Sequence, residues 1–170
     1  MKKKQHNKKG FTLIELMITI SVVTVLSILG APALSEFMEK NKIKTAATSM
    51  NSGIQLARSE AIKRNSTVSF NLTNSQWNVT TPDDELVAMA QSEVASTIIQ
   101  DTLPTGASSL TFDNVGMLTI GPDGLANISR IILTSQKTDY TLWIMLTNSG
   151  GSRICDPNET TLNSSIIGCV

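Results

Sequence analysis

The sequence is poor in the side chains that most often carry out chemistry. Its 170 residues include one histidine, two cysteines and only 4% aromatic residues. The histidine, His6, belongs to the basic first ten residues. We find neither a nucleophile with an accompanying base nor a glycine-rich phosphate loop after a strand pattern. The sequence therefore predicts a protein that is not an enzyme and uses no cofactor.

A metal site is not expected either. The run Asp83-Asp84-Glu85 supplies hard oxygen ligands, but it lacks the spaced ligand series and the sharp-turn glycine of a calcium loop. We therefore interpret residues 80–85 as a long, solvated acidic loop.

The two cysteines, Cys155 and Cys169, lie within the last 16 residues. Their spacing is that of neither a redox motif nor a zinc site. We predict a structural disulfide, the alternative being two free thiols; a loop of this length stabilises a fold by about 3 kcal/mol in the chain-entropy model.

One long apolar run is present, over residues 11–34, directly after a lysine-rich head. As a helix it is about 36 Å long, enough to cross a bilayer. Glu15 is its only ionisable side chain. A carboxylate buried there needs neutralisation or a charged partner, and an amine created at Phe11 would supply one.

The processing point that fits the pattern, Gly10 followed by Phe11, precedes the apolar run, unlike the cleavage site of a secretory signal. Removing residues 1–10 takes away five of the 14 basic residues and leaves nine against 14 acidic ones, a net charge of −5. Such a balance disfavours nucleic-acid binding over the whole surface. The basic head favours an amino end in the cytoplasm and a domain on the outer side of the membrane, with a single pass.

The helical pattern continues beyond the apolar run. Residues 35–65 form an amphipathic second half, in which apolar residues recur at steps of three and four. Gly30 and Pro32 interrupt the helix, and we expect a kink or a locally melted stretch there. The apolar stripe comprises Ile43, Ala46, Ala47, Met50, Ile54, Ala57 and Ala61.

Residues 66–170 alternate with period two and predict a β-rich domain. A first hairpin has Val68, Phe70 and Leu72 on one strand and Trp77 and Val79 on the other. The fold class is α+β, with a long helix packed on antiparallel sheet. Further strands are expected at 86–90, 94–99, 109–112, 117–120, 128–134 and 140–146, with turns at 121–124 and 148–151, and Trp77, Trp143 and Phe112 are expected in the core.

The segment Gly10-Phe11-Thr12-Leu13-Ile14-Glu15-Leu16 resembles the class III signal of type IV pilins and of type II secretion pseudopilins. The resemblance implies cleavage after Gly10 by a prepilin peptidase and N-methylation of Phe11. It also implies that Glu15 pairs with the terminal amine of a neighbouring subunit during assembly.

Residues 56–65, with the sequence LARSEAIKRN, are similar to the signature of the FimT and GspH subgroup of these proteins. Residues 112–124 and 150–155 resemble that subgroup's later glycine-containing segments. From the residues alone, the charged positions read as surface pairs one helical turn apart, such as Glu60 with Arg64.

The resemblance implies a minor pilin that helps to initiate or cap a type IV pilus, with pilin subunits and an inner-membrane assembly platform as partners. The alternative is an H-type minor pseudopilin of type II secretion. A third hypothesis is DNA binding, because Gly150 and Arg153 match part of a Gly-Arg-x-Arg motif of competence pilins, although Gly151 replaces its first arginine. Arg130 and Lys137 are candidates to join Arg153 in space.

Overall fold

The computed structural model describes residues 11–73, 76–90, 98–120, 127–159 and 167–169. The chain divides into two compact units, residues 1–37 and residues 38–170. The predicted leader and the turn expected at 121–124 lie outside the described residues. Helix α1 (Leu13–Arg64) has its first 25 residues in the first unit and the remainder in the second.

The backbone of α1 stays helical through Gly30 and Pro32. The prediction of a locally melted stretch is therefore wrong, since a proline removes a single hydrogen bond of the helix ladder while its neighbours keep theirs. The kink remains a prediction.

The carboxyl end of α1 is closed by a Schellman motif. Asn65 takes the left-handed conformation at φ 51°, and its N–H donates to the carbonyl of Ile62 over 3.3 Å. The next amide, of Ser66, donates to the carbonyl of Ala61 over 3.2 Å. Asparagine tolerates this conformation better than most residues, so the helix ends where the sequence predicts.

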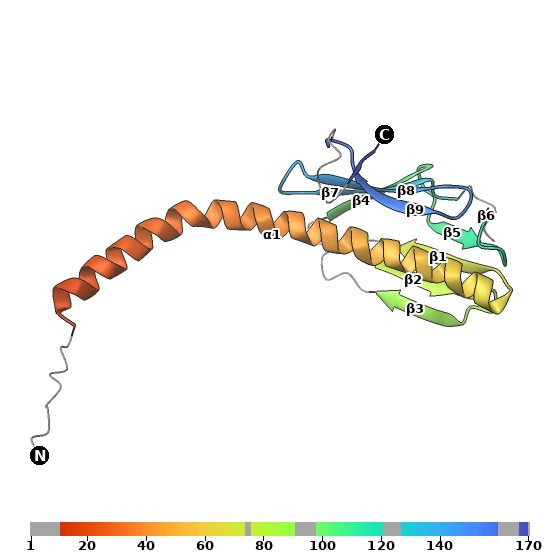
Figure 1. The fold of residues 1–170 in the computed structure, drawn as a ribbon, viewed down its shortest axis with the longest axis horizontal. Coiled ribbons are helices and arrows are strands. Elements are labelled where there is room, and N and C mark those ends of the chain that lie inside the picture. The colour runs from red at the N-terminus through yellow and green to blue at the C-terminus, as the bar shows by residue number, and fades with distance from the viewer. Residues whose placement is uncertain (1–10, 74–75, 91–97, 121–126, 160–166, 170) are drawn as a thin grey trace, which may run out of the picture. The chain divides into compact units, whose positions relative to one another are not determined.

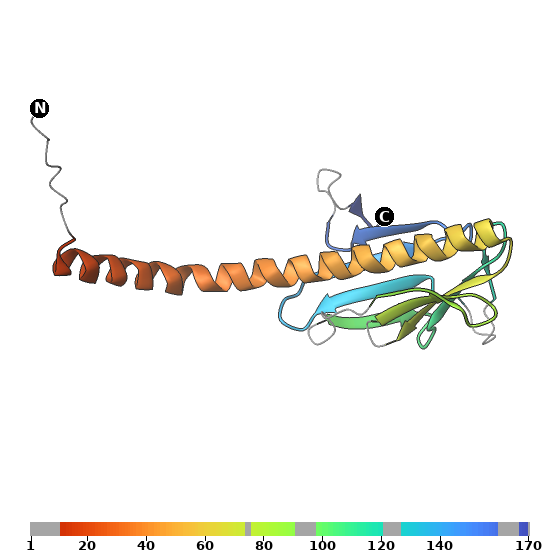
Figure 2. The ribbon, with the colours of Figure 1, turned by 90° about the horizontal axis from the view of Figure 1, so that it is seen from below.

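The second unit contains two five-stranded sheets beside α1 (Figures 1 and 2). The first has the order β3-β2-β1-β5-β6 and the second β10-β9-β8-β7-β4, and every pairing is antiparallel except β9 with β10. The first sheet comprises β1 (Val68–Thr73), β2 (Gln76–Thr80), β3 (Leu86–Ala90), β5 (Ser109–Phe112) and β6 (Leu118–Thr119). The second comprises β4 (Ile98–Leu103), β7 (Arg130–Ser135), β8 (Thr141–Leu146), β9 (Ser152–Asp156) and β10 (Ile167–Gly168).

The core lies between the carboxyl-terminal half of α1 and the inner faces of both sheets. All seven residues of the predicted apolar stripe are buried in it. Each sheet contributes alternate residues of its strands, the pattern expected when one face is covered. The strands supply Val68, Phe70, Leu72, Val79, Leu110, Phe112, Ile131, Leu133, Leu142 and Ile144.

Three strands differ from the prediction. β4 continues to Leu103, four residues beyond the predicted end, because Thr102 is buried and its hydroxyl donates to the carbonyl of Ala107 over 2.8 Å. β9 and β10 were not predicted, since the short segments that form them lack a clear alternation.

The acidic residues 83–85 belong to a compact turn between β2 and β3 rather than to a long loop. The amide of Thr81 donates to the carbonyl of Glu85 over 3.1 Å, and the amide of Asp84 donates to the carbonyl of Thr81 over 3.0 Å. Such short-range bonds fix a tight connection between neighbouring strands.

Candidate assembly and binding sites

The amino end of α1 is a capping box made by Thr12 and Glu15. The Glu15 carboxylate oxygen Oε2 accepts from the Thr12 backbone N–H over 3.0 Å and from the Thr12 hydroxyl over 3.1 Å. In return, the amide of Glu15 donates to the Thr12 hydroxyl over 3.3 Å. Our reading of the sequence gave Glu15 an assembly role and missed this capping role, although Thr-x-x-Glu before an apolar run is its signature.

The first unit exposes apolar side chains around the whole of its helix. Between Leu13 and Ile28, every Leu, Ile, Val and Met is more than half exposed. The hydroxyls of this half bond back to its own backbone, with Thr24 and Ser27 each donating over 2.8 Å to a carbonyl four residues earlier. Within the described residues, no helix has an apolar stretch long enough to cross a membrane. The transmembrane segment therefore stays a prediction.

In the second unit, Arg58 holds two turns that belong to different sheets. Its Nε donates to the carbonyl of Gly116, in the β5–β6 turn, over 3.0 Å. Its Nη2 donates to the carbonyl of Ser149, in the β8–β9 turn, over 3.2 Å. A backbone bond of 3.1 Å from Leu118 to the carbonyl of Asn148 joins the same two segments. The interpretation of Arg58 as a surface charge is therefore incomplete, because it connects helix and both sheets.

Glycine is required at both turns. Gly116 and Gly150 have φ values of 84° and 81°, in the left-handed region. A Cβ at Gly150 would collide with the carbonyl oxygen of Gly116, the oxygen that accepts from Arg58. Glycine at both positions therefore allows the two turns to approach closely enough for one guanidinium to reach both.

Glu60 is the centre of the charged pairs at the end of α1. It accepts from Arg64 over 2.9 Å, as the spacing predicts, and from Lys63 over 3.1 Å. Hydrogen bonds from Arg64 and then Lys63 lower the pKa of Glu60 below its usual value. Arg64 also pairs with Glu85 of the acidic turn over 2.9 Å. Glu85 therefore forms an ion pair with Arg64 within the domain.

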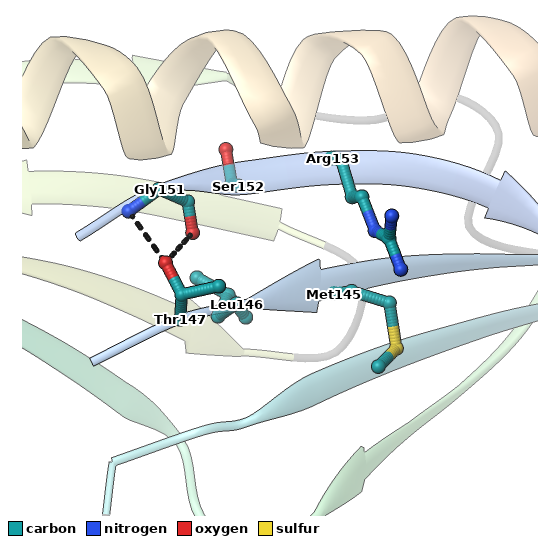
Figure 3. Close-up of a pocket in the computed structure, with 6 residues that line it drawn as sticks. All are labelled: Met145, Leu146, Thr147, Gly151, Ser152 and Arg153. Atoms are coloured by element: carbon teal, nitrogen blue, oxygen red, sulfur yellow. Dashed lines mark hydrogen bonds between the residues drawn. The ribbon is translucent and has the colours of Figure 1, made fainter. Parts of the chain in front are cut away.

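A depression of about 470 Å³ lies along the β8–β9 hairpin, next to Arg153. Figure 3 shows the Arg153 and Met145 side chains pointing the same way from neighbouring strands, whereas Ser152 points to the other side. The Ser152 hydroxyl is bonded to α1, donating to Asn51 over 2.5 Å and accepting from Gln55 over 2.6 Å. The depression is lined by Met145, Leu146, Thr147, Gly151, Ser152 and Arg153.

Of the two residues expected to join Arg153, the structure brings only Arg130 to the same face. Arg130 is directly opposite Met145, which is directly opposite Arg153. Lys137 instead follows β7 at its other end, where its Nζ lies 3.6 Å from Glu39 of α1. The DNA contact at Arg153 stays a prediction.

The structure joins Cys155 and Cys169 in a disulfide, with the two Cα atoms 5.1 Å apart. Cys155 is in β9, and the strand pairing of Cys155 with Ile167 ties β10 to the same place. The bridge therefore closes the carboxyl-terminal segment onto the second sheet. It is a structural link, because Cys155 is fully buried.

The helix, the two sheets and the amino-terminal motif define a pilin-like subunit. Comparison with known families identifies the family within this class. The family described as type II transport protein GspH matches residues 46–151, more than half of the chain, and the chain belongs to that family. The prokaryotic N-terminal methylation motif matches residues 5–31. The prediction of a GspH and FimT type of pilin with an α+β fold is confirmed.

Individual relatives come from both branches of these filaments. The type IV major alpha-pilin of Moraxella bovis is 24% identical over 139 residues, which cover 80% of this chain and 83% of the relative. The type IV minor pilin FimU of Pseudomonas aeruginosa has a similar structure, with a TM-score of 0.53 and 18% identity over 74% of this chain and 97% of FimU. The minor pseudopilin EpsH of the Vibrio cholerae type 2 secretion system also has a TM-score of 0.53, with 14% identity over 69% of this chain and 99% of EpsH. At these identities the structural likeness shows the fold.

Proposed function

We propose that this protein is a minor pilin of a bacterial type IV pilus, a structural subunit that helps to initiate or cap the fibre. The observation that carries the proposal is the helical surface between residues 13 and 28. It is apolar and exposed on every side in the isolated chain, and it follows a match to the N-terminal methylation motif. Such a surface requires cover from lipid or from the helices of other subunits.

In this proposal, a prepilin peptidase cleaves between Gly10 and Phe11, and Phe11 becomes the N-methylated amino terminus. The helix anchors the subunit in the inner membrane, with the domain in the periplasm, until the assembly platform transfers it to the filament. The likeness to FimU and the pilin of Moraxella bovis supports the pilus branch. Disulfide-closed carboxyl-terminal regions are common in the type IV pilins that this chain resembles, so the Cys155–Cys169 bridge supports the same branch.

The second candidate is a minor pseudopilin of type II secretion. The family description and the EpsH structure support it, the latter with the same TM-score as FimU. Both candidates share the anchor, the helix and the partners of pilin type, and they differ in the filament that the subunit joins.

A gene deletion distinguishes the two candidates. Surface piliation, twitching and transformation are measured together with the secretion of type II substrates in the same strain. We expect loss of pili with normal secretion. Lost secretion with normal pili would assign the protein to the pseudopilin branch, and no effect on either filament would refute both.

Glu15 is the proposed assembly residue. In the isolated chain its carboxylate is held by Thr12 at the end of α1, beside Phe11. In a filament, the positive amine of Phe11 on an incoming subunit would be attracted to this carboxylate, because charges attract strongly in a medium of low dielectric constant. The pair would set the axial register of the subunits.

The variant Glu15→Ala tests this role. We expect the precursor to be cleaved as in the wild type and incorporation into filaments to fall. Ser21→Ala, which removes a polar group from the same half of the helix, serves as the control and should assemble normally. Normal incorporation of Glu15→Ala would exclude the charge pair.

A further inference from the structure

The outer face of the second sheet carries an unusual group of large side chains. Strand pairing places Leu103, Arg130, Met145 and Arg153 in one row across β4, β7, β8 and β9. Trp143 lies on the same face, two residues along β8 from Met145. We call these five residues the arginine face. Their sequence neighbours, such as Ile131 and Ile144, point to the core.

Trp143 was expected in the core and is not. Leu142 and Ile144 on either side of it are fully buried, so Trp143 points outward and is half-buried. Its ring is covered by Arg130, whose Cζ lies 4.0 Å from the ring centroid. A guanidinium stacked on an indole is held by a cation–π attraction and keeps its planar edge available for donation.

Arg130 lacks an acceptor in this structure. Within the described ranges, its guanidinium makes no hydrogen bond and no ion pair, and its Nε is inaccessible to solvent and unbonded. Asp101, on the same face of β4, forms no ion pair with it. A half-buried charged group without an acceptor lowers the stability of the fold. A site that keeps such a group is suited to an anion supplied from outside.

The surroundings of Arg130 favour a protein carboxylate over a polyanion. Tryptophan, methionine and arginine are the residues enriched in the buried centres of protein interfaces. Leu103 is 37% exposed beside them, so the face is largely apolar. Affinity for nucleic acid rises with the number of phosphates neutralised, and this face carries only two bases, Arg130 and Arg153, with the carboxylate of Asp101 on the same side.

We propose that the arginine face docks an acidic segment of a neighbouring filament subunit, and that Arg130 binds its carboxylate. The inference rests on the proposed function, since that function supplies a neighbouring subunit. Nε of Arg130 is inaccessible, but the two terminal nitrogens Nη1 and Nη2 form a planar pair of donors that suits two parallel hydrogen bonds to a carboxylate. The depression beside Met145 and Arg153 is adjacent in the same row and accommodates a side chain flanking the acid (Figure 3).

The test uses the full-length chain in a deletion strain, with a photo-crosslinking amino acid at Leu103. Four chains are compared: the otherwise unchanged chain, Arg130→Gln, Arg130→Lys and Lys63→Gln. Lys63→Gln is the matched control, because the substitution removes the same charge from an exposed site on α1. Formation of the disulfide and resistance to protease verify that each variant folds, and the crosslinked peptide is identified by mass spectrometry.

We expect a crosslink to an acidic segment of a pilin-like subunit. Its yield should fall about tenfold or more in Arg130→Gln, as expected when one partner of a desolvated charge pair is lost. Arg130→Lys should recover only part of the yield, because lysine keeps the charge without the planar pair of donors. Lys63→Gln should match the unchanged chain. A fifth chain, Arg130→Glu, should lose the crosslink and regain it when the identified acid of the partner is replaced by arginine.

An unchanged yield in Arg130→Gln would overturn the inference, as would a crosslink to nucleic acid, to lipid or to a segment without a carboxylate. If filaments form normally in every strain and no crosslink appears at Leu103, the docking surface is wrong while the proposed function stands. If expression of the unchanged chain in the deletion strain restores neither filaments nor secretion, the proposed function itself is wrong.

Discussion

The two halves of α1 differ in how their apolar side chains are covered. In residues 13–28, large apolar side chains are exposed on all sides of the helix, as are Leu34 and Phe37, and hydroxyls such as that of Thr24 bond back to the helix backbone. In residues 38–64, seven apolar residues form one buried stripe, while most of the outward positions are polar. The carboxyl-terminal half is covered by its own domain, and the amino-terminal half has no cover within its own unit.

The carboxyl-terminal half makes fixed contacts with the sheets of its own unit. Side chains of the carboxyl-terminal half, such as Gln55 and Arg58, make hydrogen bonds to the strands and turns. In the amino-terminal half, the hydroxyls of Thr19 and Ser21 donate to carbonyls of the helix itself. We therefore expect substitutions in the first half to change assembly and substitutions in the second half to change the stability of the domain.

The largest effect is expected from a matched pair of side-chain substitutions, one in each half of α1. They are Ile54→Ala and Ile18→Ala. Ile54 is fully buried, so its loss should reduce the free energy of unfolding by about 2–5 kcal/mol through lost contacts and a cavity. Ile18 is 56% exposed, and its loss should change unfolding by less than about 0.5 kcal/mol. Thermal unfolding of the full chain in detergent, followed by near-UV circular dichroism, measures both. Equal effects would contradict the division of α1 into two roles.

The sequence predicts this helix well because its signals are local. The stripe from Ile43 to Ala61 repeats with the helical period, and the helix ends where this pattern ends. The cap made by Thr12 and Glu15 also has a local signature, although the prediction did not include it. The first hairpin also follows from alternation, and its observed pairing of Phe70 with Val79 agrees with it. Periodicity therefore specifies elements whose buried face is uninterrupted.

Contacts between distant segments could not be predicted in this way. Arg58 meets carbonyls at Gly116 and Ser149, more than 50 and 90 positions away, and a backbone acceptor leaves no mark in the sequence. Trp143 was misplaced because alternation gives two faces without saying which one is covered. Its neighbours Leu142 and Ile144 are apolar too, so residue type did not decide between them.

The next largest effect is expected for Arg58→Gln. The substitution removes the guanidinium that bonds both turns, and bonds to charged groups are worth about 1.5–3 kcal/mol. We expect a loss of about 2 kcal/mol, with faster hydrogen exchange at the amide of Leu118, which bonds across the two turns. Lys44→Gln, which removes an exposed base from the same half of α1, is the control. Unchanged exchange at Leu118 would show that Arg58 is dispensable for joining the turns.

A smaller effect is expected in the amino-terminal half for Thr12→Val, which keeps the shape of the side chain and removes its hydroxyl. The variant loses two of the three capping bonds between Thr12 and Glu15. Loss of a cap costs about 1 kcal/mol of local helix stability. Hydrogen exchange in micelles should accelerate in the first turn of α1, while the unfolding temperature of the domain stays that of the wild type. A fall in that temperature would mean that the two halves are energetically coupled.

The smallest effect is expected from pH at Glu60, in the carboxyl-terminal half. Because Arg64 and Lys63 donate to Glu60, its pKa is lower in the folded chain than in the unfolded chain. The unfolded chain therefore binds the proton more readily, and the stabilisation is present above the unfolded pKa and is lost as the pH falls through the folded one. We expect the unfolding temperature of the wild type to fall more steeply than that of Glu60→Gln on acidification below about pH 4.5, where glutamate titrates. Parallel curves for the two chains would show that the pairs around Glu60 contribute nothing to the stability of the domain.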